Sequence, residues 1–220
     1  MRDHKVIQII AMVVTVSAVT AMTLVGGGGF GAGGNSVLPR AVGGELARQA
    51  LSFHRSGGQI MVITRDTTVF ENPASDFLLE GFQRELQRAH VGIDTLQRIQ
   101  VDPLRMVEVP SGDFQNWIHH AAAGDVIVSF MGPPLFTPEQ RQQLGEISAA
   151  VVAFCPGNWP ERVDFRALLA GGVLRAAVVA RDNPSPAAKN FSRFDDRFEV
   201  VTPANVEGFM AAEEKSNAPK

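Results

Sequence analysis

Gln59-Ile60-Met61-Val62-Ile63-Thr64 is a short, almost continuous apolar run that lies between two glycines and a polar loop. A run of this length, without alternating polar positions, is typical of a strand buried on both faces of a sheet. Asn72-Pro73 then predicts a helix start, with Asn as the N-cap and Pro in the first turn. A buried strand followed by a helix is the repeating unit of parallel α/β sheets.

The same alternation continues toward the end of the chain. Apolar runs predict further strands at 91–109 (interrupted near 102–103), 125–130, 149–154, 174–180 and 198–201. The expected helices span 72–90, 111–124, a capping box beginning at Thr137, 162–170, and a short segment from Pro203. Together they predict a doubly wound, mostly parallel sheet of five or six strands in the flavodoxin-like order 2-1-3-4-5.

The first 25 residues have the pattern of an export signal. Arg2 and Lys5 provide a basic start, and an apolar run from Val6 to Val25 follows. The run is long enough for a helix that spans a bilayer, so residues 1–25 are either a membrane anchor or a signal peptide cleaved after Ala18 or Ala21. The basic start favours a cytoplasmic amino end. The expected location is therefore the periplasmic or extracellular side of the membrane, or outside the cell after cleavage.

The remaining chain divides into three predicted parts. Residues 26–57 are expected to form a glycine-rich tether and an adapter, in which Pro39 stops regular structure and 45–54 are a short amphipathic stretch. Residues 58–212 are the predicted α/β domain, and 213–220 a disordered polar tail.

Composition excludes several classes of function. The net charge is −3 and basic residues are not clustered, so nucleic-acid binding is not expected. Cys155 is the only cysteine, which excludes an internal disulfide and a cysteine-based zinc site. We interpret it as a small buried apolar residue rather than a reactive thiol.

Ligands of open α/β sheets bind outside the carboxyl ends of the strands. The loops expected at this edge contain the candidate ligand-binding residues Asp66, Thr67, Thr68, Met131, Asn158, Trp159, Arg181 and Asp182. The loop at Asp66 is the most polar and precedes a helix amino end, which favours anions. The same polar residues could instead cap their turns, and Arg181 and Asp182 could form a local surface ion pair.

No pattern of catalytic residues is present. The chain has no GxSxG, Walker, GxGxxG or HExxH motif, and the carboxylates lie singly at turns. His119 and His120 are adjacent and would point about 100° apart on a helix, so they cannot hold one metal together. No cofactor or metal is expected, and an enzyme is less favoured than a binding protein.

The order of elements resembles one lobe of the type I periplasmic binding proteins, the sugar-binding family of transport systems. The strand 59–64, the loop at Asp66, the helix 72–90 and the strand 125–130 carry the resemblance, which covers roughly residues 58–182. It implies a doubly wound lobe whose strand-end loops recognise a ligand, and it carries binding onto Asp66, Thr67 and Asn158. That family uses two lobes, whereas this chain has the length of one, so a partner chain, a self-dimer or loss of ligand binding is implied.

Two functions follow as hypotheses. The first is an exported, membrane-tethered lobe that binds a small polar solute or a partner protein. The second is a ligand-free interaction or scaffold module of a cell-envelope complex with the same fold.

Overall fold

The computed structural model describes residues 36–68, 71–101, 108–157, 163–181 and 194–216. They belong to one compact unit that begins at Asn35. Its strands are β1 (Ile60–Arg65), β2 (Thr95–Ile99), β3 (Val126–Ser129), β4 (Ala150–Cys155), β5 (Ala176–Ala180) and β6 (Phe198–Val201). Its helices are α2 (Val37–Phe53), α3 (Pro73–Arg88), α4 (Ser111–His120), α5 (Pro138–Leu144), α6 (Phe165–Ala170), α7 (Phe194–Arg197) and α8 (Val206–Ser216).

The six strands form a single sheet in the order β2-β1-β3-β4-β5-β6. All neighbouring pairs are parallel except β5 and β6, which are antiparallel. This confirms the predicted doubly wound fold and its strand order, with the sixth strand added at the edge. β3 and β4 are buried at every position, as their unbroken apolar runs predict.

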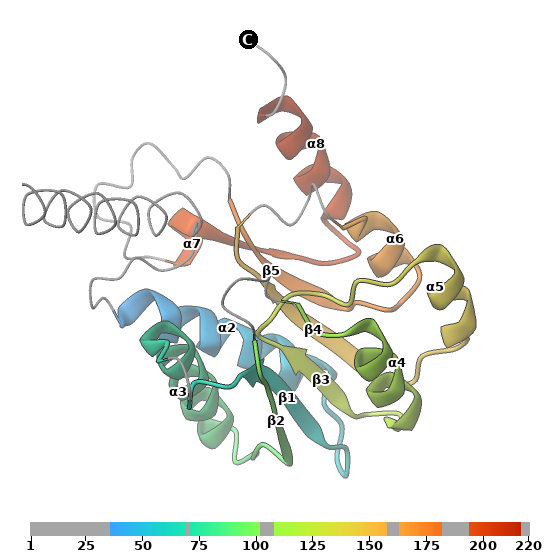
Figure 1. Ribbon diagram of the computed structural model, residues 1–220. Helices are drawn as coiled ribbons and strands as arrows, with labels where there is room; N and C mark the ends of the chain where they lie inside the picture. The colour runs from blue at the N-terminus through green and yellow to red at the C-terminus, as the bar shows by residue number, and fades with distance from the viewer. Residues whose placement is uncertain (1–35, 69–70, 102–107, 158–162, 182–193, 217–220) are drawn as a thin grey trace, which may run out of the picture. The chain divides into compact units, whose positions relative to one another are not determined.

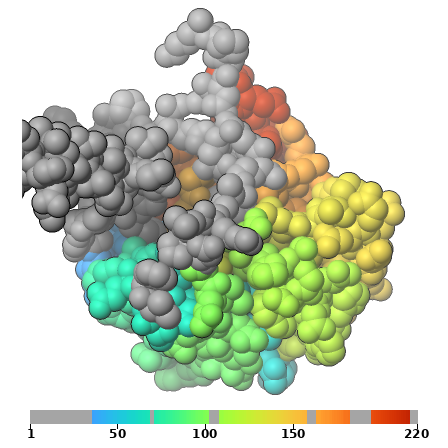
Figure 2. Space-filling view, in the orientation of Figure 1, coloured from blue at the N-terminus to red at the C-terminus, as the bar shows by residue number. Residues whose placement is uncertain are grey.

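Helices lie on both faces of the sheet (Figure 1). On one face α2 contacts β3, β4 and β5, and α3 packs beside α2. On the other face α4 packs against α5, and α6 against α8. The space-filling view shows α3 in teal on one side and α4 and α5 in green to yellow on the other (Figure 2).

A close backbone contact joins α2 and α3. A Cβ atom placed on Gly43 would lie 2.0 Å from the carbonyl oxygen of Leu78, and one on Gly81 would lie 2.2 Å from that of Arg40. Each glycine therefore lets the other helix approach to a distance that no side chain permits. Leu78, buried on α3, occupies a position that the helical spacing of apolar residues predicts.

Helix α2 differs from the sequence expectation. The sequence predicts a tether and adapter over residues 26–57 and an α/β domain from residue 58. Helix α2 instead begins at Val37 and is packed into the α/β unit, with Val42, Leu46 and Ala50 fully buried. Pro39 does not stop regular structure because it lies in the first turn of the helix, where a missing N–H leaves no hydrogen bond unmade.

Local capping signals agree with the structure at two further helices. Asn72 accepts a hydrogen bond from the Ser75 N–H at the start of α3, and the complete capping box of Thr137 and Gln140 begins α5. Helix α4 is shorter than expected, because it ends at His120 rather than at Gly124. Gly124 instead has φ +99° in the turn before β3, a backbone conformation that favours glycine.

The carboxyl-terminal helix extends beyond its predicted limit. Helix α8 begins at Val206 and continues to Ser216, beyond the residue at which the polar tail was expected to start. The predicted apolar leader 1–25 and the glycine tract lie outside the described residues. Across the part of the chain that the structure describes, no helix is both long enough and apolar enough to cross a membrane.

Candidate functional site

The loop after β1 presents a carboxylate at the carboxyl edge of the sheet. The backbone N–H of Asp66 donates to the carbonyl oxygen of Ile99 at the end of β2 (2.8 Å), so the start of the loop is tied to the neighbouring strand. The Oδ1 atom of Asp66 accepts hydrogen bonds from the backbone N–H (2.9 Å) and the hydroxyl (2.7 Å) of Thr68. Its second oxygen, Oδ2, accepts no hydrogen bond from the described residues.

These contacts favour the ionised form of Asp66. The backbone N–H of Thr68 and then its hydroxyl lower the pKa of the carboxyl group, and the charge of Arg98 on β2 contributes in the same direction. Partial burial opposes them, but the hydrogen bonds dominate. Asp66 is therefore a negatively charged hydrogen-bond acceptor whose position is fixed by Thr68. Its Oδ2 atom has no donor among the described residues.

Thr67 has a structural contact of its own. Its hydroxyl donates to Oδ1 of Asp76 in the first turn of α3, at 3.2 Å. This bond joins the loop to the helix that follows it, so Thr67 braces the site rather than offering a free hydroxyl. Thr68 is exposed, and its hydroxyl donates a hydrogen bond to Asp66.

Met131 lies at the end of β3, next to β1 in the sheet, but it does not face solvent. Only 4% of its surface is exposed, and it belongs to the apolar core. Its backbone N–H bonds to the buried hydroxyl of Ser129 at 3.2 Å. The side chain therefore packs beneath the edge instead of forming a surface for a ligand.

Arg181 follows β5 and pairs across the sheet edge. Its Nη2 lies 3.2 Å from Oε2 of Glu199 on β6, and its Nε donates to the carbonyl oxygen of Phe198 at 3.3 Å. β5 is separated from β1 by β3 and β4, which places the two strand ends roughly 14 Å apart at ordinary strand spacing. Arg181 and Asp66 thus share an edge without being neighbours. Asn158, Trp159 and Asp182 lie outside the described residues.

A groove on the helical face of α2 and α3 has no counterpart among the residues that the sequence pattern predicts for a site. A cavity of about 820 Å³ lies between these helices and the segment of α7 and β6, and Arg181 is part of its wall. Five arginines contribute to its lining, namely Arg40, Arg48, Arg84, Arg88 and Arg181.

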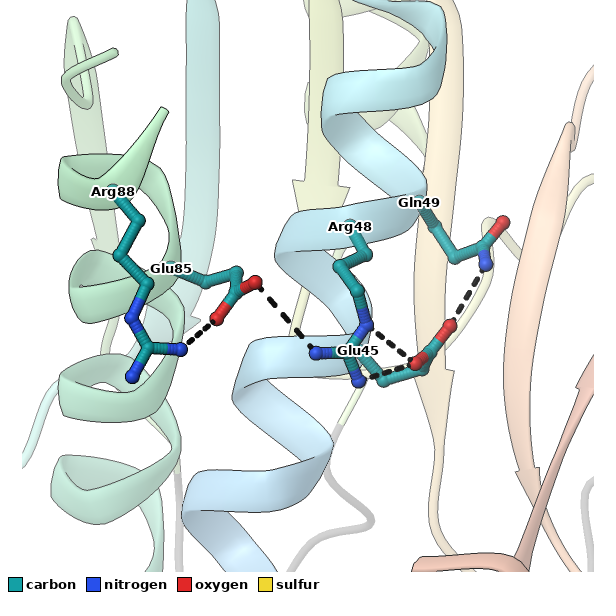
Figure 3. A network of polar contacts seen from close by, with 5 residues as sticks. All are labelled: Glu45, Arg48, Gln49, Glu85 and Arg88. Carbon is teal, nitrogen blue, oxygen red and sulfur yellow. Dashed lines mark hydrogen bonds and ion pairs between the residues drawn. The ribbon is translucent and has the colours of Figure 1, made fainter. Parts of the chain in front are cut away.

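Glutamates neutralise most of these arginines. Arg48 pairs with Glu45 at 2.6 Å and approaches Glu85 at 3.7 Å, and Glu85 also pairs with Arg88 at 2.8 Å (Figure 3). The pairs within a helix have spacings of three or four residues that the sequence displays. The contact between Arg48 and Glu85 joins two helices, so only the packing of α2 on α3 reveals it.

The described residues contain no group of three or more His, Cys, Asp and Glu side chains that could hold a metal ion. His119 and His120 are exposed near the end of α4, and Nδ1 of His120 contacts the carbonyl oxygen of Asn116 at 2.7 Å. At the carboxyl edge, the Oδ2 atom of Asp66 is a hydrogen-bond acceptor without a donor among the described residues.

Comparison with known proteins identifies the fold. No protein-family model matches the chain, and no curated protein matches it by sequence. Among solved structures, a periplasmic ribose ABC transporter from Conexibacter woesei has 12% identity and a TM-score of 0.51, over 80% of this chain and 62% of that one. An arabinose-binding protein from Geobacillus stearothermophilus has 14% identity and a TM-score of 0.50, over 78% of this chain and 63% of that one.

These likenesses confirm the resemblance at the level of the fold, which is that of a type I periplasmic binding protein lobe. The chain spans 61–64% of the length of the first solved structures that it matches.

Proposed function

We propose that this chain is a binding lobe for a small polar solute or a partner protein, related to the substrate-binding proteins of transport systems. The observation that carries the proposal is the carboxylate of Asp66, which the backbone and hydroxyl of Thr68 hold at the carboxyl end of β1. In open α/β sheets this edge is where ligands bind. An ionised carboxylate with a free oxygen is an acceptor for hydroxyl or amine hydrogens.

Ligand binding is tested by thermal unfolding in the presence of a panel of sugars, small acids and amines. A ligand at a hundred times its Kd stabilises the native state by roughly 2.7 kcal/mol. For a domain of this size, that free energy corresponds to a rise in Tm of roughly 5–10 °C. If no compound of the panel raises Tm, binding of a small solute is contradicted.

The role of Asp66 is tested with Asp66→Ala, for which the ligand-dependent rise in Tm should disappear. Each variant is compared with its own ligand-free Tm, because losing the contacts with Thr68 also changes basal stability. Asp113→Asn is the matched control, since this exposed carboxylate lies in the first turn of α4. An unchanged ligand shift in Asp66→Ala would remove the loop after β1 from the site.

The proposal includes export and attachment to the membrane through residues 6–25. The basic start and apolar run of the leader support it. Cell fractionation with mass analysis of the amino terminus tests both fates. An intact chain in the membrane fraction indicates an anchor, a chain that begins after Ala18 or Ala21 indicates cleavage, and an intact chain in the cytosol contradicts export.

A single lobe leaves a ligand partly open to water, whereas ligand sites commonly bury 70–90% of the ligand surface. We therefore include a second lobe, supplied by a partner chain or by a second copy, in the proposal. Light scattering with and without the stabilising ligand tests it, because closure by two chains requires the mass to rise when the ligand binds.

The groove of about 820 Å³ between α2, α3 and β6 favours a second candidate, a ligand-free interaction module of a cell-envelope complex. Its wall carries alternating arginines and glutamates, which suit a partner of complementary charge pattern. In that case detergent-extracted protein should elute as a stable larger complex. Asp66→Ala should leave its size unchanged, while a monomer would count against the candidate.

A further inference from the structure

The amino edge of the sheet holds a second, smaller cavity, at the opposite end of the strands from Asp66. Its volume is about 360 Å³. Asp125 precedes β3, Ala150 begins β4 and Arg175 precedes β5, so the walls come from the starts of three neighbouring strands. Arg55, which follows α2, and Ser148, which precedes β4, complete the polar lining.

The two arginines of this cavity differ from those of the α2–α3 groove. In the groove, Arg40, Arg48 and Arg88 each pair with a glutamate. Within the part of the chain that the structure describes, the guanidinium groups of Arg55 and Arg175 have no ion pair and no hydrogen bond. Two arginines thus line one small cavity, and neither has an ion-pair partner among the described residues.

Both arginine side chains lie against glycine backbone. A Cβ atom placed on Gly124 would meet Cβ of Arg55 at 3.1 Å and its Cδ at 3.8 Å, so the stem of Arg55 lies across this glycine. A Cβ atom on Gly172 would lie 3.8 Å from Cζ, Nη1 and Nη2 of Arg175, so this guanidinium lies beside the turn before β5. Gly124 and Gly172 both have positive φ, at +99° and +69°.

Both carboxylate oxygens of Asp125, the acidic residue of the lining, accept hydrogen bonds from backbone N–H groups. Its Oδ1 accepts from the backbone N–H of Gln59 at 2.8 Å, and its Oδ2 accepts from that of Ala122 at 2.7 Å. The carboxylate therefore holds the turn before β3 and leaves both guanidinium groups unneutralised. Among the lining side chains, two positive charges face one negative charge, so the cavity has a net positive charge.

We propose that this cavity, lined by Arg55, Arg175 and the hydroxyl of Ser148, binds a phosphate group, free or as the terminal group of a small phosphomonoester. Guanidinium groups form charge-assisted, often bidentate hydrogen bonds with phosphate oxygens. A tetrahedral oxyanion has several oxygens, so it can accept hydrogen bonds from donors on different segments, here Arg55 after α2 and Arg175 before β5. A volume of about 360 Å³ accommodates such a group with a short ester chain.

The test is calorimetric titration of the full chain with inorganic phosphate and, separately, with glycerol phosphate. The ionic strength is held constant because salt screens exposed charges. Saturable binding is expected, and Arg55→Gln and Arg175→Gln should each weaken it about tenfold, the loss of a charged hydrogen bond. Arg84→Gln, which removes the same charge from α3, is the matched control and should leave the affinity unchanged.

The two probes distinguish the sources of the phosphate. Equal affinities assign the site to the free ion, and tighter binding of glycerol phosphate assigns it to a phosphomonoester. The absence of saturable binding by either probe, or an equal loss in Arg84→Gln, overturns the proposal. Asp66→Ala should bind phosphate normally, so failure here is distinguishable from failure of the proposed solute site.

Discussion

Thr68 determines the state of the carboxylate on which the proposed solute site depends. Its backbone N–H is the main cause of the lowered pKa of Asp66, and its hydroxyl is the second. The prediction at this position is that Thr68→Val, which removes only the hydroxyl, raises the pKa of Asp66 toward its ordinary value. Carbon-detected NMR titration of the side-chain carboxyl group measures the change.

Thr67→Val is the matched control for that titration. Its hydroxyl donates to Asp76 at 3.2 Å and not to Asp66. The pKa of Asp66 should therefore remain low in Thr67→Val. If the pKa of Asp66 is the same in Thr68→Val and in the parent, the hydroxyl of Thr68 does not contribute to the ionisation of Asp66.

Glu80 makes the α2–α3 contact dependent on pH. Hydrogen bonds from Arg40 (2.7 and 2.9 Å) lower the pKa of this glutamate, and the charges of Arg40 and Arg84 act in the same direction. Because the folded pKa lies below the unfolded one, the pair stabilises the native state above the ordinary glutamate range. This stability is lost as pH falls through the folded pKa.

Unfolding in urea at a series of pH values, from neutral to acid, tests this dependence in the parent chain and in Glu80→Gln. The variant should be less stable at neutral pH, and the difference should narrow as the pH falls. A difference that stays constant with pH would mean that the ion pair makes no titratable contribution to stability.

Two adjacent glycines of α2 differ in their contact with α3, so we expect opposite effects on stability when each is replaced by alanine. A Cβ atom at Gly43 would overlap the carbonyl oxygen of Leu78, whereas at Gly44 the nearest side-chain atom is Nη1 of Arg48, at 3.8 Å. Gly43→Ala should therefore destabilise the fold by about 1–3 kcal/mol, through overpacking. Gly44→Ala should stabilise the fold by about 0.5–1 kcal/mol, because alanine lowers the backbone conformational entropy of the unfolded chain.

Chemical unfolding of the two alanine variants measures this difference. They have the same composition and lie on the same helix, so helix propensity affects both equally. Variants of equal stability would show that α2 and α3 do not approach as closely as described.

Elements with local signals were predictable, and the element that depends on remote contacts was not. Asn72 and Thr137 cap α3 and α5 through residues three positions away, which a sequence pattern contains. Helix α2 contains two adjacent glycines, Gly43 and Gly44, which are unfavourable in an isolated helix. Its packing on β3, β4, β5 and α3 stabilises it nevertheless.

Cys155 is a probe of opening of the whole unit, because it lies fully buried at the end of the central strand β4. Burial raises the pKa of its thiol well above the ordinary value, so the native protein presents almost no thiolate. A thiol reagent should label the native chain negligibly, and labelling should increase with urea along the unfolding transition. Cys155 is the only cysteine of the chain, so the signal has one source.

The same chain in full denaturant provides the reference rate for a free thiol. Rapid labelling without denaturant would show that the unit opens locally at β4, and it would contradict the burial of Cys155.

The packing of the sheet places the candidate site residues more precisely than the sequence of their loops suggests. Parallel strands bring the loops after β1, β3 and β5 to one edge, as predicted. Met131 nevertheless turns into the core, and Arg181 pairs with Glu199 on β6. Asp66 therefore carries the proposal, because it retains a charge and a free acceptor oxygen.

The alternation of buried strands and capped helices, and with it the doubly wound sheet and its strand order, can be predicted from the amino-acid sequence. Those features arise from apolar periodicity and capping contacts between residues close together in the chain. Three features become visible once the chain is folded: α2 belongs to the packed unit, arginines on α2 and α3 share glutamates, and Arg55 and Arg175 line one cavity. These depend on contacts between residues far apart in sequence, whose distances are set only when the sheet and both helical layers pack together.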